Sequence, residues 1–192
     1  MVKYFSVDCD LTLVQTDTGW LNWLLSKASE LDATNWNLFH KDKAVYNYNL
    51  ATYFPSVDNP MEYWNDLDYD QFQPLEGSIE ALERINHYFP VIFTSHIEGS
   101  HGKSKANWIK KHYPFQSGII YTREKSVLCG SVVGHVDDRL SHLKGFEITK
   151  RYLFNTKYLQ DTCVRDTFVM ETIYDWKDLG SSFVNDLLKM WR

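Results

Sequence analysis

The sequence predicts an α/β domain: a three-layer sandwich with a parallel central sheet and a small helical cap inserted after the first strand. Three observations favour this class. Short, continuously apolar runs recur along the chain, amphipathic helical segments lie between them, and the long stretch after the first run has no strand rhythm. Continuous rather than alternating hydrophobicity is typical of strands buried on both faces, as in a parallel sheet.

The apolar runs are rich in β-branched and aromatic residues, and each ends in polar residues, as expected where a buried strand leaves a sheet. In chain order, the predicted strands are Tyr4–Val7, Val91–Phe93, Gly118–Tyr121, Val132–Val136 and Tyr152–Phe154. Strands that alternate with helices indicate the parallel sheet of an α/β fold.

Helices are expected between and after these strands, at Ser78–Phe89, Lys103–His112 and Ser181–Trp191. Ser78 is a suitable N-cap for the first of them, and its apolar residues fall on one face. Pro90 and Pro114 end the first two helices, because proline lacks the backbone N–H that a helix needs.

One segment, residues 18–74, departs from this alternation. Its start, Gly19–Leu25, predicts a helix, whereas Pro55 and Pro60 mark turns. We therefore expect residues 1–17 and 75–192 to form the core domain and residues 18–74 to form a helical cap subdomain. Twelve of the 30 aromatic residues lie in this segment.

Composition narrows the class of protein. The 192 residues carry a net charge of -5, with 44% apolar and 23% charged side chains, which is typical of a soluble globular protein. The acidic balance argues against a nucleic-acid coat or a polybasic membrane binder. Cys9, Cys129 and Cys163 are too few and too scattered for a disulfide framework or a zinc site. Without an apolar run of roughly 18–20 residues or an apolar signal sequence, we expect a cytoplasmic protein.

Two carboxylates, Asp8 and Asp10, follow the first predicted strand. Residues two apart in an extended chain point the same way, so both carboxylates face one spot. Adjacent carboxylates repel, and one pKa rises unless a cation neutralises them. The alternative is a solvated turn, because Asp is common where a strand passes into a loop.

Hydroxyls and lysines lie at later strand exits. Thr94 and Ser95 follow the second strand, where hydroxyls either bind phosphate oxygens or cap the loop. Lys105 and Lys125 are candidate point charges against a phosphoryl group, although most lysines are simply solvated.

A second pair of carboxylates, Asp137 and Asp138, follows the run Val132–Val136. Paired carboxylates suit magnesium, which prefers a few carboxylates together with water and phosphate, but they also occur in Asp-rich turns. The carboxyl ends of parallel strands share one edge of a sheet, and open α/β sheets build their sites there.

The order Asp-x-Asp, strand-Thr-Ser, Lys, strand-Asp-Asp is more specific than any of its parts. In this order, residues 3–17 and 73–192 resemble the haloacid dehalogenase-like (HAD) phosphatase superfamily. A closer similarity, to the 5′(3′)-deoxyribonucleotidase family, is carried by Gln73–Gly77, Phe93–Ser95, Lys105–Trp108, Ile119–Lys125, Val136–Asp138, Leu153–Asn155 and Ile173–Trp176.

The resemblance implies a magnesium-dependent phosphoric monoester hydrolase of the 5′-nucleotidase type. Such an enzyme hydrolyses deoxyribonucleoside monophosphates to nucleoside and phosphate through an aspartyl-phosphate. Asp8 would be the nucleophile and Asp10 the general acid and base. The implied metal ligands are Asp8, Asp10, Asp137 and Asp138. The implied phosphate-binding residues are Thr94, Ser95, Lys125 and Lys105. Trp64 lies near the position of the family's pocket tryptophan, and Trp20 follows the first motif close to the site, so both are candidate nucleoside-binding residues. The alternative is that these tryptophans pack in a small core of the cap.

Some positions depart from the closer family. Leu11-Thr12 replaces its usual Gly-Val, and Thr16 lies near the position of its nucleobase-stacking phenylalanine. These differences leave the base preference open. The alternatives are a HAD phosphatase of a sugar phosphate or a nucleic-acid 3′-phosphate, and a non-catalytic binding module on the same scaffold.

The negative charge belongs to one segment. Residues 18–74 hold eight acidic and three basic residues, whereas the rest of the chain is balanced. An acidic cap over the site would repel a polyanionic strand, while a single phosphate still reaches Lys125 and magnesium. We therefore expect a small nucleotide substrate, no nucleic-acid polymer and no membrane partner; a homodimer is left open.

Overall fold

The computed structural model describes residues 2–65, 67–96, 100–146, 149–158, 170–179, 184–186 and 189. Within these residues a parallel sheet has the strand order β3-β2-β1-β4-β5-β6. The strands are β1 (Tyr4–Asp8), β2 (Val91–Ser95), β3 (Gly118–Tyr121), β4 (Val132–Asp137), β5 (Lys150–Phe154) and β6 (Met170–Ile173). The predicted parallel α/β sheet is confirmed, and the order reverses between β1 and β4.

The strand predictions were accurate for the interior of the sheet and incomplete at its edge. All five predicted strands are present, and four of them are one or two residues longer than predicted. The edge strand β6 was not predicted. Its sequence is Met-Glu-Thr-Ile, and Glu171 interrupts the continuous apolar run that identified the buried strands.

The helices of the core are α3 (Ser78–Asn86), α4 (Gly102–His112) and the short α5 (Leu140–Leu143). Helix α3 ends three residues before the predicted Phe89, because a turn precedes Pro90. Its start follows Gly77, whose left-handed φ of 79° favours glycine. Of the predicted helix Ser181–Trp191, residues 184–186 and 189 are helical, and the other residues lie outside the part that the structure describes.

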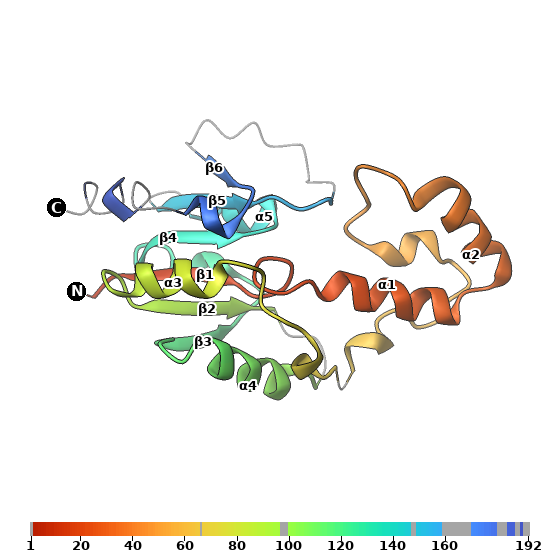
Figure 1. Ribbon diagram of the computed structural model, residues 1–192, viewed down its shortest axis with the longest axis horizontal. Coiled ribbons are helices and arrows are strands. Elements are labelled where there is room, and N and C mark those ends of the chain that lie inside the picture. The colour runs from red at the N-terminus through yellow and green to blue at the C-terminus, as the bar shows by residue number, and fades with distance from the viewer. Residues whose placement is uncertain are drawn as a thin grey trace.

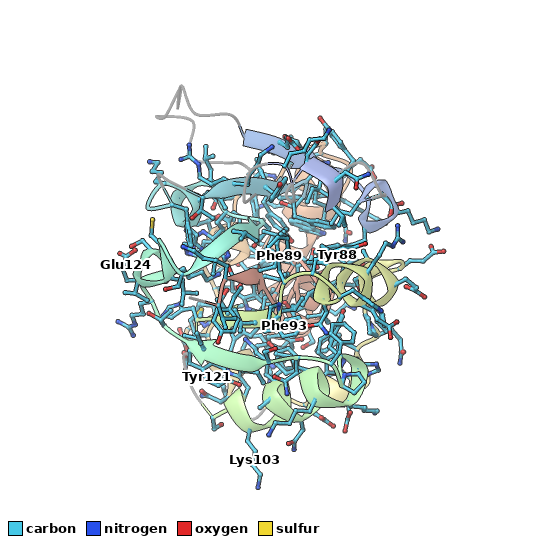
Figure 2. The ribbon with its side chains drawn as sticks, turned by 90° about the vertical axis from the view of Figure 1, so that its left-hand side faces the viewer. Tyr88, Phe89, Phe93, Lys103, Tyr121 and Glu124 are labelled. Atoms are coloured by element: carbon cyan, nitrogen blue, oxygen red, sulfur yellow. The ribbon has the colours of Figure 1, made fainter. Side chains whose placement is uncertain are left out.

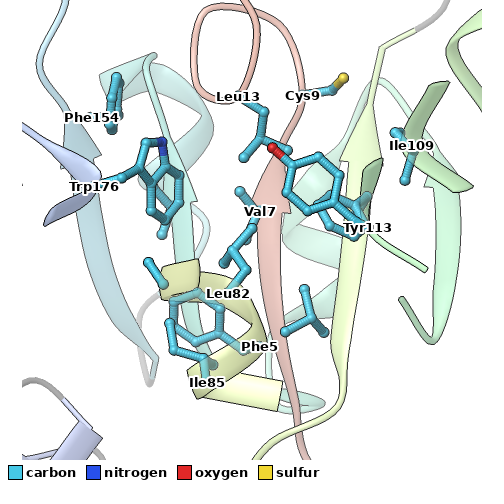
Figure 3. Close-up of a cluster of buried hydrophobic side chains, with 14 of the residues drawn as sticks. Phe5, Val7, Cys9, Leu13, Leu82, Ile85, Ile109, Tyr113, Phe154 and Trp176 are labelled. Carbon is cyan, nitrogen blue, oxygen red and sulfur yellow. The ribbon is translucent and has the colours of Figure 1, made fainter. Parts of the chain in front are cut away.

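The main core lies between α3, α4 and one face of the sheet. Figure 3 shows Leu82 and Ile85 of α3 directed at Phe5 and Val7 of β1, and all four are essentially inaccessible to solvent. A smaller cluster on the opposite face joins Ile92, Leu128, Val132 and Phe146. Helices and turns on both faces of the sheet complete the three layers.

The segment between β1 and α3 contains α1 (Thr16–Lys27), α2 (Glu30–Asn35) and several short helical turns. Figure 1 shows α1 and α2 beyond the carboxyl ends of the strands, away from α3. Residues of α1 and of the shorter turns form a second hydrophobic cluster around Trp36, Leu24 and Phe54. Most aromatic side chains of this segment therefore build a small core of its own. Its limits as a separate cap domain, 18–74, stay a prediction.

Residues 18–74, here called the insertion, also contact the core through a segment that follows β5. The chain after β5 reaches it at Tyr158, which packs in the insertion's hydrophobic cluster. The backbone N–H of Tyr46 donates to the carbonyl of Lys157 at 2.7 Å. The insertion is thus attached at β1, at α3 and beside the end of β5. No helix among the described residues is long and apolar enough to span a bilayer.

Candidate active site

The carboxyl ends of β1 and β4 bring three carboxylates together. Val7 pairs with Val136, so Asp8 and Asp137, the last residues of their strands, lie side by side. Carboxylate oxygens of Asp8, Asp137 and Asp138 lie within 4.8 Å of one another, and all three residues are buried. This point is where the strand order reverses, which is the usual position of a site in an open α/β sheet.

Lys125 lies among these carboxylates. Its Nζ is 2.5 Å from Oδ1 of Asp8 and 2.6 Å from Oδ2 of Asp137. Burial alone would lower the pKa of Lys125, but the two carboxylates more than offset this effect and raise it. The ammonium is therefore held in its charged form, and the helical turn Lys125–Leu128 fixes its position.

The carboxylates differ in their electrostatic environments. Burial raises the pKa of Asp8, although Lys125 opposes the change. Burial and the nearby Asp8 raise the pKa of Asp138 well above its ordinary value. Asp137 is also desolvated, yet Lys125 and hydrogen bonds from His135 and His142 hold its pKa well below that range.

This donor set fits magnesium. Three buried carboxylates within reach of one another repel, and a hard cation would relieve that repulsion. Oxygen ligands of this kind suit magnesium, calcium or manganese rather than a thiolate-binding metal. The metal-ligand roles predicted for Asp8, Asp10, Asp137 and Asp138 stay predictions.

Asp10 lies beside this group in a network of its own. Its Oδ2 is 2.6 Å from Nζ of Lys105, and its Oδ1 accepts a hydrogen bond of 2.5 Å from Tyr69. Burial disfavours the charged carboxylate, but Lys105 and the hydrogen bonds outweigh this and lower the pKa of Asp10. The same Lys105 donates to Oγ of Ser95 at 2.6 Å. Lys105 thus links the exit of β2 to Asp10.

Two lysines of α4 show how specific this placement is. Lys105 is fully buried, with its ammonium 5.1 Å from the centre of the Tyr69 ring. Lys103, two residues earlier on the same helix, is exposed and extends outward in Figure 2. The sequence left open which of Lys105 and Lys125 contacts the phosphate. In the structure they contact different carboxylates, Lys105 that of Asp10 and Lys125 those of Asp8 and Asp137.

The hydroxyls of Thr94 and Ser95, which were predicted to bind phosphate, lie beneath the surface of the cavity described below. Thr94 pairs with Asp8 in the sheet, but its hydroxyl donates to the carbonyl of Val7 at 3.3 Å. Ser95 accepts from Lys105, as described above, and donates to the carbonyl of His96. Both side chains are fully buried, and neither lines the cavity. Their predicted contacts with phosphate stay a prediction.

A cavity of about 250 Å³ lies between these carboxylates and the insertion. Small-molecule sites are typically about 300–1,000 Å³, and this cavity, just below that range, has room for no more than a single small ligand. The two predicted tryptophans form part of its wall, with ring centres 5.9 Å apart. The residues lining the reactive end are Asp8, Asp10, Lys125 and Asp138.

Several site residues were not predicted from sequence as members of the site. Tyr69 contacts Asp10 from the insertion, while His135 and His142 lie 3.1–3.3 Å from the carboxylate of Asp137. The histidines are two and five residues from Asp137, so the short spacing was a usable signal. Nothing in the sequence around Tyr69 indicated its contact with a residue 59 positions away.

Solved structures share this architecture. A haloacid dehalogenase-like hydrolase from Burkholderia xenovorans matches with a TM-score of 0.62 and 14% identity, covering 97% of this chain and 98% of that one. A haloacid dehalogenase-like family hydrolase from Xanthomonas campestris gives a TM-score of 0.60 at 11% identity, over 98% and 97% of the two chains. The chain has the haloacid dehalogenase-like fold.

The HAD-like fold is also that of YfnB, a HAD hydrolase from Bacillus subtilis bound to magnesium. Its TM-score is 0.55 at 13% identity, over 96% of this chain and 99% of that chain. No protein-family model matches the sequence, and no curated protein matches it. The likeness to these HAD-like structures is therefore one of fold, and the proposals below depend on the site itself.

Proposed function

We propose that this chain is a magnesium-dependent phosphomonoesterase that hydrolyses deoxyribonucleoside monophosphates. The observation that supports it best is the convergence of Asp8, Asp137 and Asp138 around the ammonium of Lys125, with Asp10 beside them. A nucleophilic carboxylate, a hard-cation site and a fixed positive charge are the components that phosphoryl transfer requires.

Magnesium would be held by Asp8, Asp137 and Asp138, together with phosphate and water. When bound, it neutralises charge on the phosphoryl oxygens and on the carboxylates around them. The B. subtilis relative bound to magnesium has the same fold, which supports this cofactor. Lys125 uses two of its three N–H donors on Asp8 and Asp137, so one remains for a phosphoryl oxygen.

Asp8 would attack phosphorus in line with the ester bond. The new bond joins a carboxylate oxygen to phosphorus, and the bond from phosphorus to the leaving oxygen breaks. Asp10 supplies a proton to that oxygen and then takes one from the water that hydrolyses the aspartyl-phosphate. The first transfer requires a protonated carboxyl, so Asp10, which Lys105 and Tyr69 hold as a carboxylate in the described structure, would take up a proton from solvent as the substrate binds. The products are nucleoside and inorganic phosphate, and Asp8 is regenerated.

Three residues fix the position of Asp10. Lys105 and Tyr69 hold its two carboxylate oxygens from opposite elements, α4 and the end of the insertion. Ser95 fixes Lys105 in turn. We assign Lys105 to positioning Asp10, whereas Lys125 is the lysine that faces the phosphoryl group. Thr94 and Ser95 are the last two residues of β2; Thr94 lies beside Asp8, and Ser95 lies beside Lys105.

The cavity wall supports a nucleoside as the leaving group. Trp20 is held by a hydrogen bond of 2.8 Å from its Nε1 to the carbonyl of Pro60, and Trp64 packs against it. Stacking a base on an aromatic ring contributes about 1–3 kcal/mol and tolerates different bases. The acidic residues of the insertion would disfavour a polyanionic strand, which favours a mononucleotide.

A phosphate-release assay tests the proposal. Purified protein is incubated with deoxyribonucleoside and ribonucleoside monophosphates, sugar phosphates and a 3′-phosphorylated oligonucleotide, each with magnesium and with a chelator. We expect magnesium-dependent release that is fastest for the deoxyribonucleotides. Faster release from a sugar phosphate or the oligonucleotide would show another HAD-type phosphatase, and no release from any ester would favour a binding module.

A further inference from the structure

One acidic residue of the cavity has no part in the chemistry above. Asp17 lies in the first turn of α1 and is buried, and it lines the cavity. Its Oδ2 accepts a hydrogen bond of 2.7 Å from the hydroxyl of Tyr158, and Nζ of Lys157 is 3.8 Å away. Its Oδ1 is also buried but makes no hydrogen bond to any residue that the structure describes.

The position of Asp17 is on the leaving-group side of the reaction. The preceding residue, Thr16, has its hydroxyl 3.5 Å from Oδ1 of Asp10, the group proposed to protonate the leaving oxygen. Asp10, Thr16 and Asp17 line the same cavity, together with Trp20 one turn further along α1. A leaving group that extends from Asp10 towards the tryptophans would therefore pass Asp17.

The chemistry of a carboxylate limits what binds there. A carboxylate oxygen only accepts hydrogen bonds, so its partner must carry an O–H or N–H. A buried oxygen without such a partner is unfavourable, and unpaired polar atoms of this kind often mark the place of a ligand or an ordered water. In a nucleoside 5′-phosphate, the 3′-hydroxyl is a donor only a few bonds from the ester oxygen.

Resting on the proposed function, we propose that Asp17 is a specificity-determining residue whose Oδ1 accepts a hydrogen bond from the 3′-hydroxyl of the nucleotide sugar. Tyr158 occupies the other oxygen, which leaves Oδ1 as the acceptor for the sugar. The arrangement places phosphate at Lys125, the ester oxygen at Asp10, the sugar at Asp17 and the base at the tryptophans.

The test compares thymidine 5′-monophosphate with 3′-deoxythymidine 5′-monophosphate in magnesium, using the wild type, Asp17→Asn and Tyr158→Phe. The readout is the ratio of kcat/KM for the two nucleotides. We expect the wild type to prefer the 3′-hydroxyl by about 10- to 100-fold, as for a hydrogen bond to a charged group. Asp17→Asn should reduce this ratio to a few-fold, and Tyr158→Phe should keep it, because that change leaves Oδ1 intact.

Each of the other possible outcomes contradicts one part of the proposal. Equal kcat/KM for the two nucleotides in the wild type overturns the role of Asp17 whether or not the variants fold. A ratio that falls as far in Tyr158→Phe as in Asp17→Asn would assign Asp17 to holding the chain after β5 instead. No phosphate release by the wild type from either nucleotide overturns the proposed function, and the assignment of Asp17 with it.

Discussion

Replacing Lys105 by methionine removes the charge that holds Asp10 while keeping an unbranched side chain of similar length. The ammonium lost in Lys105→Met makes two contacts of 2.6 Å, to Asp10 and to Ser95. Removing one partner of a fully buried ion pair costs about 3–5 kcal/mol. Because Asp10 is 26% exposed, water replaces part of the interaction, and we expect a loss of about 2–3 kcal/mol in the free energy of unfolding.

Urea unfolding followed by circular dichroism measures this loss. With a slope of about 1–3 kcal/mol per molar urea, the midpoint should fall by about 1 M or more. Lys103→Met is the matched control, since it makes the same change on an exposed position of the same helix. Its free energy of unfolding should stay within about 0.5 kcal/mol of the wild type.

The kinetic effect should accompany the loss of stability. Without Lys105, Asp10 keeps the hydrogen bond from Tyr69 and the longer one from Thr16 among the described residues, both to the same oxygen, so kcat should fall about 10- to 100-fold at temperatures where the variant is folded. If Lys105→Met unfolds at the same urea concentration as Lys103→Met and retains kcat, the reasoning about this ion pair is wrong.

Three further changes test other parts of the structure. Tyr69→Phe keeps the buried ring but removes the hydroxyl on Asp10, so kcat should fall about 10-fold while the unfolding midpoint falls no further than in Lys105→Met; an unchanged kcat would refute the positioning role. Trp64→Ala should raise KM for a nucleotide more than for a simple aryl phosphate, and equal effects in steady-state assays would remove it from the nucleoside pocket. Gly134→Ala should lower the free energy of unfolding by about 1–3 kcal/mol in urea titrations, because the added Cβ would lie 2.7 Å from the ring of Phe5. Gly118→Ala is the control and should be neutral, because the space around Gly118 is open. Equal effects of the two changes would contradict this packing argument.

Local sequence signals were sufficient for the interior of the fold. Strands such as β1 and β4 are buried on both faces, so their continuous apolar runs predicted them. The exits of these strands then predicted Asp8 and Asp137 as neighbours. Strand β6 lies at the edge of the sheet, where burial on both faces is not required, and its composition gave no comparable signal.

Local sequence signals could not predict contacts between segments that are far apart in the chain. Tyr69 and Asp17 belong to the site only because the insertion folds back beside the ends of β1 and β5. The sequence offered both Lys105 and Lys125 as candidate cations, and their three-dimensional positions separate the one on Asp10 from the one on Asp8. The carboxylate that each lysine contacts, rather than its position along the chain, distinguishes their roles.

The central claim is that Asp8 is the nucleophile of a magnesium-dependent phosphatase. The most direct measurement is phosphate release from a deoxyribonucleoside monophosphate by the wild type and by Asp8→Asn, with magnesium and with a chelator. We predict magnesium-dependent release by the wild type and a loss of at least about 1,000-fold in the variant, with an unchanged circular dichroism spectrum. Appreciable magnesium-dependent release by Asp8→Asn would contradict the account.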